Sequence, residues 1–399
     1  MINIAILGFG VVGSGIADVI TTNQEEIKRK VGDNINVKYI LDLREFPDSP
    51  FADRVVHDYN IILNDPEISL VAEAMGGLHP AVDFTMQALK AKKSVVTSNK
   101  EVVAEAGDML LKLAAENGVR YLFEASVGGG IPILRPLANC LASNKILEIN
   151  GILNGTTNYI LTQMIDFGKT FETALKEAQQ KGYAEANPTA DVEGIDACRK
   201  ICILGAIAFG KLINPAEVST KGISKIRLED VKNAAEAGYA IKLIGQAKEI
   251  DGKMSVSVAP RLVSYNNLLS KVDDVFNGVL VTGNAVDDVL FIGRGAGKLP
   301  TASAVVADII DIAGRPELKN DIWDKADKDD LLCPCKKVAA YYVAANVDEN
   351  TAKDIFGNYS AISLRDGEFS FITEKMTGKD IDDKLSKLGD KAVSVIEVL

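Results

Sequence analysis

The sequence predicts an α/β protein with a parallel-sheet domain, an α+β domain and a small C-terminal βαββαβ domain. Three observations lead to this fold class. The chain begins with an apolar run at 2–7 and a glycine-rich turn at 8–13. Strand-like and helix-like segments then alternate up to residue 132, which indicates parallel strands joined by crossover helices. The segment 338–399 shows a β-α-β-β-α-β order of its own. We therefore expect a Rossmann-type sheet domain at the start of the chain.

The first turn follows the strand 2–7 directly and precedes a helical stretch through Ile20. Its first glycine allows a tight turn, the second lets the backbone approach a pyrophosphate, and the third lets helix and strand pack closely. The N-terminus of the helix faces the phosphate charge. A purely structural glycine turn is the alternative. The glycine-rich turn directly follows a chain-initial strand, which favours the binding of a dinucleotide. The residues of this turn are Gly8, Phe9, Gly10, Val11, Val12 and Gly13.

Cofactor preference stays open at the second strand, 36–41, which is followed by Asp42 and Arg44. An acid at this strand end binds the ribose hydroxyls of NAD, whereas an arginine accommodates the phosphate of NADP. Because both residues are present, we expect NAD(P)H without choosing between the two forms.

Two later strands, 69–74 and 94–97, end in turns that complete this candidate cofactor site. Ligands bind at the carboxyl ends of parallel strands, so these turns and the first one converge on one crevice. The turns carry Gly76, Gly77, Ser98 and Lys100. For Lys100 the alternative is an exposed loop lysine. Helices are expected at 81–92 and 101–117, and a further strand at 120–123.

After Pro132 the pattern changes. A strand at 148–153 leads into the polar turn Asn154-Gly155-Thr156-Thr157-Asn158, and helices are expected at 159–166 and 171–181. The segments 254–259 and 278–282 alternate like half-buried strands. A second glycine-rich loop at 293–300 precedes an apolar helix at 301–313. Its Gly297 would face the same cofactor, or the loop would serve as a hinge.

The stretch 182–200 gathers acidic side chains around one lysine. Asn187-Pro188 imposes an extended or turn conformation, so we expect a helix to start near Asp191, which can cap the first turn. On that helix Asp196 and Lys200 are four residues apart and share a face. An ordinary surface ion pair is the alternative. The helix continues as the apolar run 201–209, which indicates burial and makes Lys200 a candidate catalytic group.

Composition narrows the function classes. The net charge of −11 argues against nucleic-acid binding, and no apolar run reaches the length of a membrane span. The first residues lack the features of a signal peptide, so we expect a cytoplasmic enzyme. Only His57 and His79 are present, which shifts acid–base work to lysine and carboxylates. The five cysteines are expected to be reduced; a metal site is a weak alternative for Cys198, Cys202, Cys333 and Cys335.

Domain boundaries follow from these changes of pattern. The expected dinucleotide-binding domain covers 1–133 and is completed by 298–320. The expected α+β domain covers 134–297. A polar, charged segment at 321–337 reads as a linker to the C-terminal domain, 338–399.

Taken together, the motifs resemble those of the homoserine dehydrogenase family. Its members interconvert L-aspartate 4-semialdehyde and L-homoserine with NAD(P)H, in the biosynthesis of threonine, methionine and isoleucine. The resemblance extends from residue 1 to about residue 315, with the motifs in order and at the expected spacing. It rests on G-F-G-V-V-G (8–13), E-A-M-G-G (73–77), T-S-N-K (97–100), E-A-S-V-G-G-G-I-P (124–132), N-G-T-T-N-Y-I (154–160), the stretch 182–200 and G-R-G-A-G-K-L-P-T-A-S-A-V-V-A-D (293–308).

The resemblance implies a role for individual residues. Lys200 matches the proton donor and acceptor, and Lys100 matches a second lysine that meets both cofactor and substrate. The α+β domain would be catalytic and would also form the dimer interface, so a homodimer or a tetramer is expected. A monovalent cation, described with Na⁺, is implied at Glu124 and the main-chain carbonyls of Val127, Gly129 and Ile131. The residues that match substrate-binding positions are Glu185, which would meet the substrate's amino group, Asp191, Asp196, Asn154, Gly155 and Thr156.

The C-terminal unit resembles the ACT domain that some members of the family use for threonine feedback. It departs from that pattern at 347–351, which lacks the proline-glycine usual after the first strand. Threonine inhibition is therefore not predicted, and a role in oligomerisation or a vestigial role is the alternative.

Two other functions remain as alternatives. One is another Rossmann oxidoreductase of aspartate-derived semialdehydes, such as aspartate-semialdehyde dehydrogenase, which handles the same metabolite through a cysteine thioester. That chemistry needs an activated cysteine with a histidine partner, yet Cys140 stands alone between the glycine turn and the acidic stretch, and no histidine follows His79. The other is a non-catalytic NAD-binding regulator, which would need neither Lys200 nor the carboxylates.

Overall fold

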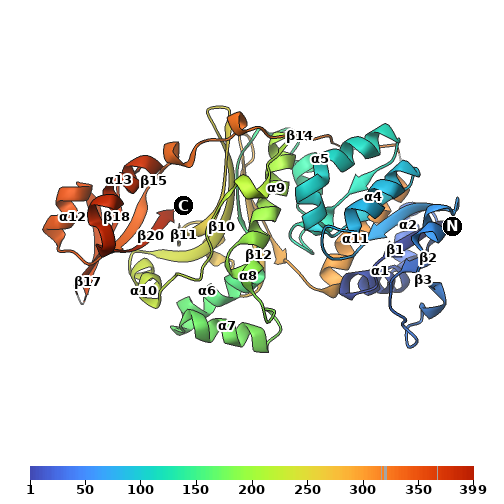
Figure 1. Cartoon of the computed structure of the whole chain (residues 1–399), viewed down its shortest axis with the longest axis horizontal. Helices are drawn as coiled ribbons and strands as arrows, with labels where there is room; N and C mark the ends of the chain where they lie inside the picture. Colours follow the sequence, from blue (N-terminus) through green and yellow to red (C-terminus); the bar gives the residue numbers. More distant parts are fainter. Residues whose placement is uncertain (316, 319–320, 366) are drawn as a thin grey trace. The chain divides into compact units, whose positions relative to one another are not determined.

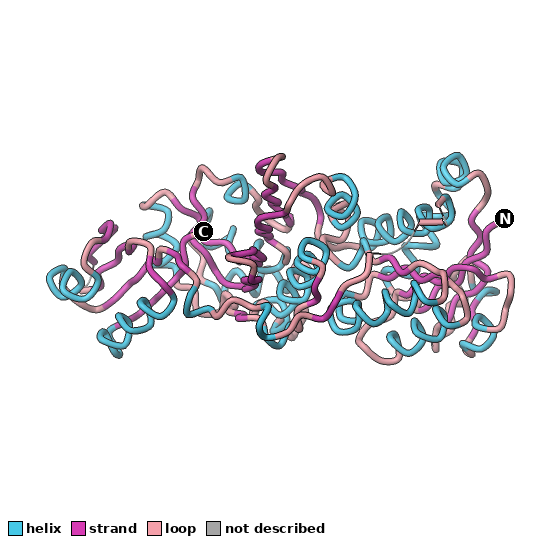
Figure 2. Tube along the Cα trace, turned by 90° about the horizontal axis from the view of Figure 1, so that it is seen from above, coloured by secondary structure: helices cyan, strands magenta, loops and turns pink. Residues whose placement is uncertain are grey.

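The alternating strands and helices at the start of the chain form a six-stranded parallel sheet with the strand order β3-β2-β1-β4-β5-β6. The order reverses between β1 and β4, which is where a Rossmann-type sheet binds its ligand. The structure is a computed structural model that describes residues 1–315, 317–318, 321–365 and 367–399. Many of its elements are labelled in Figure 1, and Figure 2 shows the same chain coloured by secondary structure.

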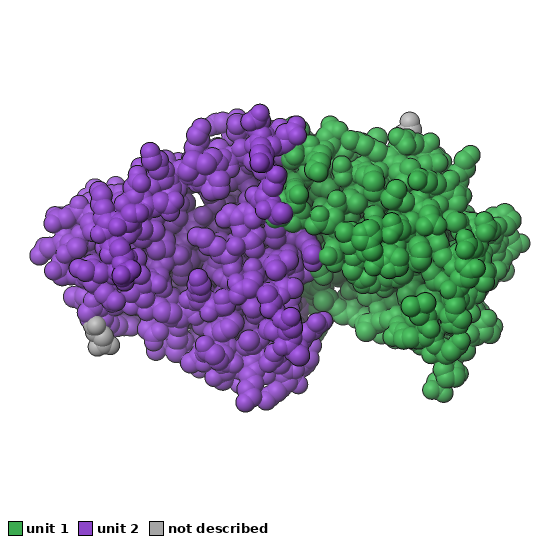
Figure 3. Space-filling model, viewed as in Figure 1, with its two compact units in different colours: residues 1–143, 202–215, 293–326 green, residues 144–201, 216–292, 327–399 purple. Residues whose placement is uncertain are grey.

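The described chain forms two compact units (Figure 3). Unit 1 contains residues 1–143, 202–215 and 293–326. Its helices and strands are β1 (Ile2–Leu7), α1 (Val11–Thr22), α2 (Gln24–Val31), β2 (Ile35–Leu41), β3 (Val55–Val56), α3 (Tyr59–Leu63), β4 (Ile68–Glu73), α4 (Ala81–Lys90), β5 (Ser94–Thr97), α5 (Lys100–Glu116), β6 (Tyr121–Leu122), β8 (Lys211–Leu212), α11 (Lys298–Gly314) and β14 (Asp324–Lys325).

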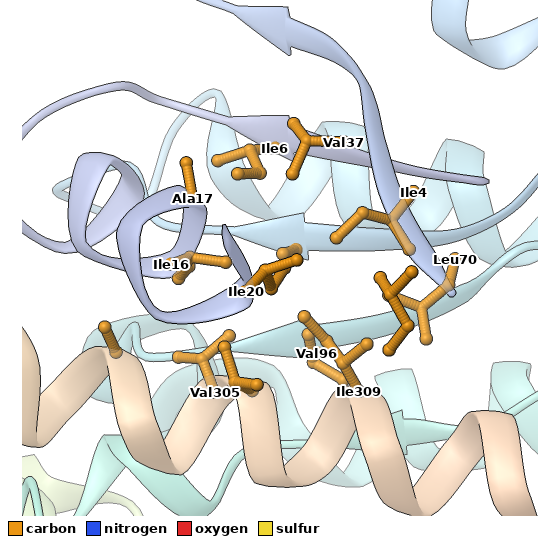
Figure 4. Packing of buried hydrophobic residues seen from close by; sticks show 14 of the residues in the cluster. Ile4, Ile6, Ile16, Ala17, Ile20, Val37, Leu70, Val96, Val305 and Ile309 are labelled. Atoms are coloured by element: carbon orange, nitrogen blue, oxygen red, sulfur yellow. The ribbon is translucent and has the colours of Figure 1, made fainter. Parts of the chain in front are cut away.

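The core of unit 1 lies between the sheet and the helices α1 and α11. The strands are apolar on both faces because helices cover both sides. Helices α1 and α11 cover one face of the sheet, and α4 and α5 cover the opposite face. Alternate strand residues therefore face the two layers, and those on the α1 side pack with apolar residues of both helices (Figure 4): Ile4, Ile6, Leu70 and Val96 from the strands, Ile16 and Ile20 from α1, Val305 and Ile309 from α11.

Unit 2 contains residues 144–201, 216–292 and 327–399 and is built on a ten-stranded mixed sheet. The path through that sheet is β13-β12-β7-β10-β11-β20-β16-β18-β17, and β9 pairs with β11. The elements before the C-terminal segment are β7 (Ile146–Ile152), α6 (Gly155–Phe167), α7 (Phe171–Gln180), α8 (Thr189–Val192), α9 (Ile195–Phe209), β9 (Ser219–Thr220), α10 (Leu228–Glu236), β10 (Tyr239–Ile250), β11 (Lys253–Ser264), β12 (Phe276–Gly283) and β13 (Asp287–Arg294). Residues 202–209 of α9 and 293–294 of β13 belong to unit 1.

The C-terminal segment has the expected β-α-β-β-α-β order, and its strands continue the sheet of unit 2. Strand β20 pairs in parallel with β11 at Arg261↔Glu397 and Leu262↔Val398. This segment also has a small apolar core of its own around Phe356, Phe369 and Phe371. Its elements are β15 (Val338–Ala339), β16 (Tyr341–Ala345), α12 (Glu349–Phe356), β17 (Tyr359–Arg365), β18 (Glu368–Thr373), β19 (Met376–Thr377), α13 (Gly378–Leu388) and β20 (Ala392–Val398).

The fold class expected from the sequence is confirmed: a Rossmann-type parallel sheet, a mixed-sheet α+β part and a C-terminal sheet region. The stretch that reads as a linker, 321–337, holds the short strand β14 and the buried Trp323. The helix expected to complete the first domain is α11, which lies in unit 1. The end of the expected range 298–320 includes Pro316, Lys319 and Asn320, which are outside the described residues.

Two sequence expectations are wrong in detail. The helix expected to begin near Asp191 is instead two helices, α8 and α9, because Gly194 adopts a φ of 80° and ends the first. The expectation of reduced thiols fails for Cys333 and Cys335, which form a disulfide. Among the described residues, Cys140, Cys198 and Cys202 are not part of a disulfide. In the described part of the chain no group of three His, Cys, Asp or Glu side chains could hold a metal ion, and no helix is long and apolar enough to cross a membrane.

Candidate active site

In unit 1 the glycine-rich turn after β1 has the backbone that the motif predicts. Gly8 has a φ of 88°, which favours glycine. A Cβ at Gly13 would lie 1.9 Å from the Gly8 carbonyl oxygen, so only glycine fits there. A Cβ at Gly10 would meet nothing within 4 Å. The space beside Gly10, at the N-terminus of α1, is therefore open to a ligand.

Asp42 ties the end of β2 to this turn. Its Oδ2 accepts a hydrogen bond from the Phe9 main-chain N–H at 2.8 Å, and Arg44 donates to both carboxylate oxygens, at 3.0 and 2.9 Å. The hydrogen bonds from Arg44, followed by that from Phe9, outweigh desolvation and hold the pKa of Asp42 well below its usual range. The carboxylate is thus ionised and neutralised by an exposed guanidinium. A ribose hydroxyl or a ribose phosphate can meet this pair.

Glu73, the last residue of β4, links the other turns at the carboxyl end of the sheet. It belongs to the 73–77 motif, but no role follows for it from the sequence. Glu73 is fully buried, and its carboxylate accepts hydrogen bonds from the Met75 N–H and the Thr97 hydroxyl. Asn99 caps α5, whose first residue is Lys100. The turn residues expected to bind cofactor, Gly76, Gly77, Ser98 and Lys100, therefore lie on two loops that share one buried network.

The second glycine-rich loop lies in the same unit. Gly297 precedes the first turn of α11 with a φ of 125°. Helices α1 and α11 approach closely, because a Cβ at Gly15 would lie 2.9 Å from the Lys298 carbonyl oxygen. Gly297 thus belongs to the unit that carries the first glycine turn.

The loop 124–135 is held by charge and by main-chain hydrogen bonds. The Glu124 carboxylate accepts from the N–H groups of Ile133, Leu134 and Arg135, at 2.7, 2.8 and 2.8 Å. The Glu124 N–H donates to Asp308, which pairs with Arg135. Burial raises the pKa of Asp308 to about 7, against the attraction of Arg135. The Glu124 side chain is therefore committed to shaping the loop.

The same loop offers neutral oxygens to a cation. Glu124, Val127, Gly129 and Ile131 are buried. Among the described residues, no backbone hydrogen bond outside helices and strands ends at the carbonyl oxygens of Val127, Gly129 and Ile131, whereas Glu124 opens a 3-10 turn, Glu124–Ser126. A buried carbonyl group without a hydrogen-bond donor destabilises the folded protein unless another partner binds its oxygen. A donor set of neutral oxygens fits a monovalent cation, whereas a transition metal would use nitrogen or sulfur ligands.

In unit 2 the acidic cluster forms around Lys200, on the first half of α9. Lys200 is buried, and its ammonium donates to the Leu153 carbonyl and to Asp196 Oδ2, each at 2.7 Å. The ion pair lies within one helix face, as its spacing predicts. These two acceptors take two of the three N–H bonds of the ammonium, so the third can reach a substrate oxygen.

Asn154 joins the two aspartates of this cluster. Its Nδ2 donates to Asp191 at 2.7 Å and to Asp196 at 2.9 Å. Its Oδ1 accepts from the Thr157 N–H and so caps α6, which begins at Gly155. Burial, together with the charge of Asp196, raises the pKa of Asp191. The cluster is thus negatively charged around one lysine.

The remaining substrate-binding candidates lie at the edge of this cluster. The Thr156 hydroxyl donates to the Tyr183 carbonyl at 2.6 Å, which ties α6 to the loop before α8. Gly155 lies tightly against Val275, whose carbonyl oxygen would be 2.7 Å from a Cβ. Glu185 is exposed on that loop, and no hydrogen bond from the described residues joins its carboxylate to the cluster.

The predicted site residues therefore form two sets. Lys100, the glycine turns and the 124–131 loop lie in unit 1, and Lys200, Asn154 and the aspartates lie in unit 2. Sequence reasoning missed the Leu153 carbonyl, Glu73 and Thr97. Strand-end position is the signal that could have found the last two, since both follow the rule that sites lie at carboxyl ends of strands.

Comparisons with known proteins show the family to which the chain is similar. Two family models match: homoserine dehydrogenase over residues 132–310 and homoserine dehydrogenase, NAD binding domain, over residues 8–124. A curated homoserine dehydrogenase of Bacillus subtilis is 43% identical over 77% of this chain and 72% of its own length. One from Lactococcus lactis is 34% identical over 100% of this chain and 92% of its own length.

Solved structures extend the similarity to the whole chain. A homoserine dehydrogenase from Thiobacillus denitrificans has a TM-score of 0.91 at 36% identity, covering 100% of this chain and 98% of its own. A hyperthermophilic archaeal homoserine dehydrogenase in complex with NADPH has a TM-score of 0.68 at 29% identity, covering 80% of this chain and 99% of its own.

Proposed function

The chain belongs to the homoserine dehydrogenase family of nicotinamide-dependent oxidoreductases, and from this premise we propose that Lys200 and Lys100 catalyse its reaction. The substrate pair would be L-aspartate 4-semialdehyde and L-homoserine. The observation that carries the assignment is the buried ammonium of Lys200, held by Leu153 and Asp196 beside a second carboxylate. A non-catalytic regulator would have no use for this arrangement.

The proposed mechanism uses the charge of this cluster. When bound, the nicotinamide would supply the hydride that the aldehyde carbon receives. Lys200 would stabilise the alkoxide that develops on the substrate oxygen and protonate it. In the reverse direction the same amine would accept the hydroxyl proton. Asp196 and Asp191 keep negative charge beside the lysine, and with Glu185 they offer carboxylates to the substrate's ammonium group.

The cofactor would bind to the glycine-rich turn at 8–13, to Asp42 and Arg44, and to Gly297. The turns at 76–77 and 98–100 would complete its site. The Arg44–Asp42 pair supports use of both forms, because Asp42 suits the ribose hydroxyls of NADH and Arg44 neutralises the acid that would otherwise repel the phosphate of NADPH. The carbonyls of Glu124, Val127, Gly129 and Ile131 would hold a monovalent cation such as Na⁺. The active species would be a homodimer or a tetramer.

The decisive experiment measures oxidation of NADH and of NADPH with L-aspartate 4-semialdehyde. We expect Lys200→Ala to lower kcat by about 10²–10⁴-fold, the usual contribution of general acid catalysis. The exposed Lys176 of α7 provides a matched control, and Lys176→Ala should retain full activity. Normal turnover in Lys200→Ala would refute the assignment of the proton donor. An inactive wild type with both cofactors would refute the proposed substrate.

A further inference from the structure

Glu73 is a buried carboxylate for which the proposed mechanism has no use. It ends β4 and is 0% exposed, between Leu7 of β1 and Thr97 of β5 in the register of the sheet. The strand order reverses at this point, where the cofactor crevice lies. A buried acid without a cation partner is costly, so its retention at this place calls for a reason.

A chain of hydrogen bonds runs from Glu73 to both neighbouring turns. One carboxylate oxygen accepts from the Met75 N–H at 2.7 Å, which shapes the start of the 75–77 turn. The other accepts from the Thr97 hydroxyl, and Thr97 Oγ1 accepts in turn from the Asn99 N–H at 2.8 Å. The Asn99 Nδ2 then donates to the Gly77 carbonyl at 2.7 Å, which closes the loop between the two turns.

The far end of this chain is the start of α5. Asn99 Oδ1 caps the helix by accepting from the Glu101 and Val102 N–H groups. Lys100 is the first residue of the helix and follows Asn99 directly. A change in the Glu73 carboxylate would therefore reach the backbone of Lys100 through only two residues, Thr97 and Asn99.

We propose that Glu73 is a positioning residue that locks the 75–77 turn to the N-terminus of α5 and thereby sets the position of Lys100 toward cofactor and substrate. The inference rests on the proposed function of Lys100 and of the two turns. Glu73 acts through Thr97 and Asn99, since it is itself fully buried.

The chemistry of the network makes this lock sensitive to protons. Thr97 has one hydroxyl proton, which it donates to Glu73, while its oxygen accepts from Asn99. In the present pattern both carboxylate oxygens accept hydrogen bonds, and protonation of Glu73 would add a donor and remove acceptor capacity, which weakens the network. Burial raises the pKa of Glu73 to about 7, against the hydrogen bonds from Thr97, Met75 and Asn99. The titratable neighbour is Tyr121 of β6, whose pKa burial raises well above its usual value. No cation of the described chain counters the burial of Glu73.

The test compares variants by pH profile and by cofactor affinity. Glu73→Gln keeps the size of the side chain but cannot ionise. We expect wild-type kcat to rise through an inflection near pH 7, and Glu73→Gln to lose that inflection and about 10–100-fold in kcat at pH 8, the loss typical of a misplaced catalytic group. Substrate-free titration with NADPH, followed by its fluorescence, reports on the turns independently of the reaction.

A second test changes Thr97 and uses the buried Thr85 as a matched control. Thr97→Val removes the hydroxyl group that joins Glu73 to Asn99, and we expect a loss of at least about tenfold in kcat. Thr97→Ser restores the hydroxyl and should recover activity. Thr85 of α4 is 1% exposed and its hydroxyl has no hydrogen-bond partner among the described residues, so Thr85→Val should behave as wild type. Thermal unfolding checks that each variant folds; if Glu73→Gln does not, the threonine pair decides.

The outcomes separate this inference from the proposed function. A Thr97→Val enzyme no worse than Thr85→Val, or a Glu73→Gln enzyme with the wild-type pH profile and NADPH affinity, would overturn it. If Lys100→Ala keeps full activity, the role proposed for Lys100 fails. A weakened NADPH affinity in Glu73→Gln would even then support the coupling of the two turns.

Discussion

At the scale of single residues, the site in unit 2 depends on charges that burial disfavours. Asp191 and Asp196 share one amide donor, Asn154; Lys200 forms an ion pair with Asp196 and only attracts Asp191 through its charge. Asp191 is the less well supported of the two, because burial and the charge of Asp196 raise its pKa. Such a group serves function at the expense of stability.

This conflict gives a prediction for Asp191→Asn. Because the folded-state pKa is raised above the unfolded value, the stabilising contribution exists below the unfolded pKa and is lost as the pH rises through the folded one. At pH 7 the ionised carboxylate therefore costs stability, and the neutral amide should unfold at an equal or higher temperature. Without the charge, kcat/KM for the amino-acid substrate should fall by about 10–100-fold.

The measurements are thermal unfolding at pH 7 and steady-state kinetics in both directions. The exposed Asp166, on the same helix that Asn154 caps, serves as a control for loss of one negative charge. A less stable Asp191→Asn protein with normal kinetics would contradict the argument, since it would make the carboxylate structural.

At the scale of elements, the start of α1 requires glycine at Gly10 and at Gly13 for different physical reasons. A Cβ at Gly13 would overlap the Gly8 carbonyl oxygen at 1.9 Å, whereas a Cβ at Gly10 would point into open space. The first restriction comes from packing within the protein. The second position is free in the protein, so we expect that only a ligand that approaches the backbone would restrict it.

Alanine substitutions at these positions should therefore separate stability from cofactor binding. Gly13→Ala forces the turn apart, and we expect a loss of about 1–3 kcal/mol in the free energy of unfolding. Gly10→Ala should unfold as wild type yet bind NADH and NADPH at least about tenfold more weakly. Differential scanning calorimetry and cofactor titration check both. Equal cofactor affinity in Gly10→Ala and wild type would remove Gly10 from the proposed site.

Most elements of the fold could be predicted from the sequence because their apolar periods and turn residues agree. Strand β10 was missed, since the sheet buries almost every residue from Ala240 to Ala247 and no alternation remains. Helix α6 begins at Gly155, four residues before the expected 159, because its first turn is polar and buried. Lys200 and Asp196 could be paired by helical spacing, whereas the carbonyl of Leu153, distant in sequence, could not.

At the scale of the whole molecule, the C-terminal segment is not held by its own apolar core alone. In unit 2 it also joins the catalytic sheet through β20, where Glu397 pairs with Arg261 of β11 and with Lys337. The Arg261 side chain is 0% exposed. Burial and the neighbouring Arg261 lower the pKa of Lys337 to about 8. One buried and one partly buried cation thus depend on one carboxylate.

Glu397→Gln should consequently weaken the attachment of this segment to the sheet. Burial would raise the pKa of Glu397, but Arg261 and Lys337 overcome it and lower the pKa, so the ion pair contributes stability above the unfolded pKa and loses it as the pH falls through the folded value. At pH 7 the variant leaves Arg261 without its charged acceptor, and we expect a loss of about 2–3 kcal/mol in the free energy of unfolding. The exposed Glu374→Gln is the control, and the unfolding midpoint in urea is the measurement. The difference between the two variants should shrink toward acid pH, where Glu397 of the wild type also becomes neutral. A difference that persists unchanged there would mean that packing around Glu397, rather than its charge, joins the C-terminal segment to β11.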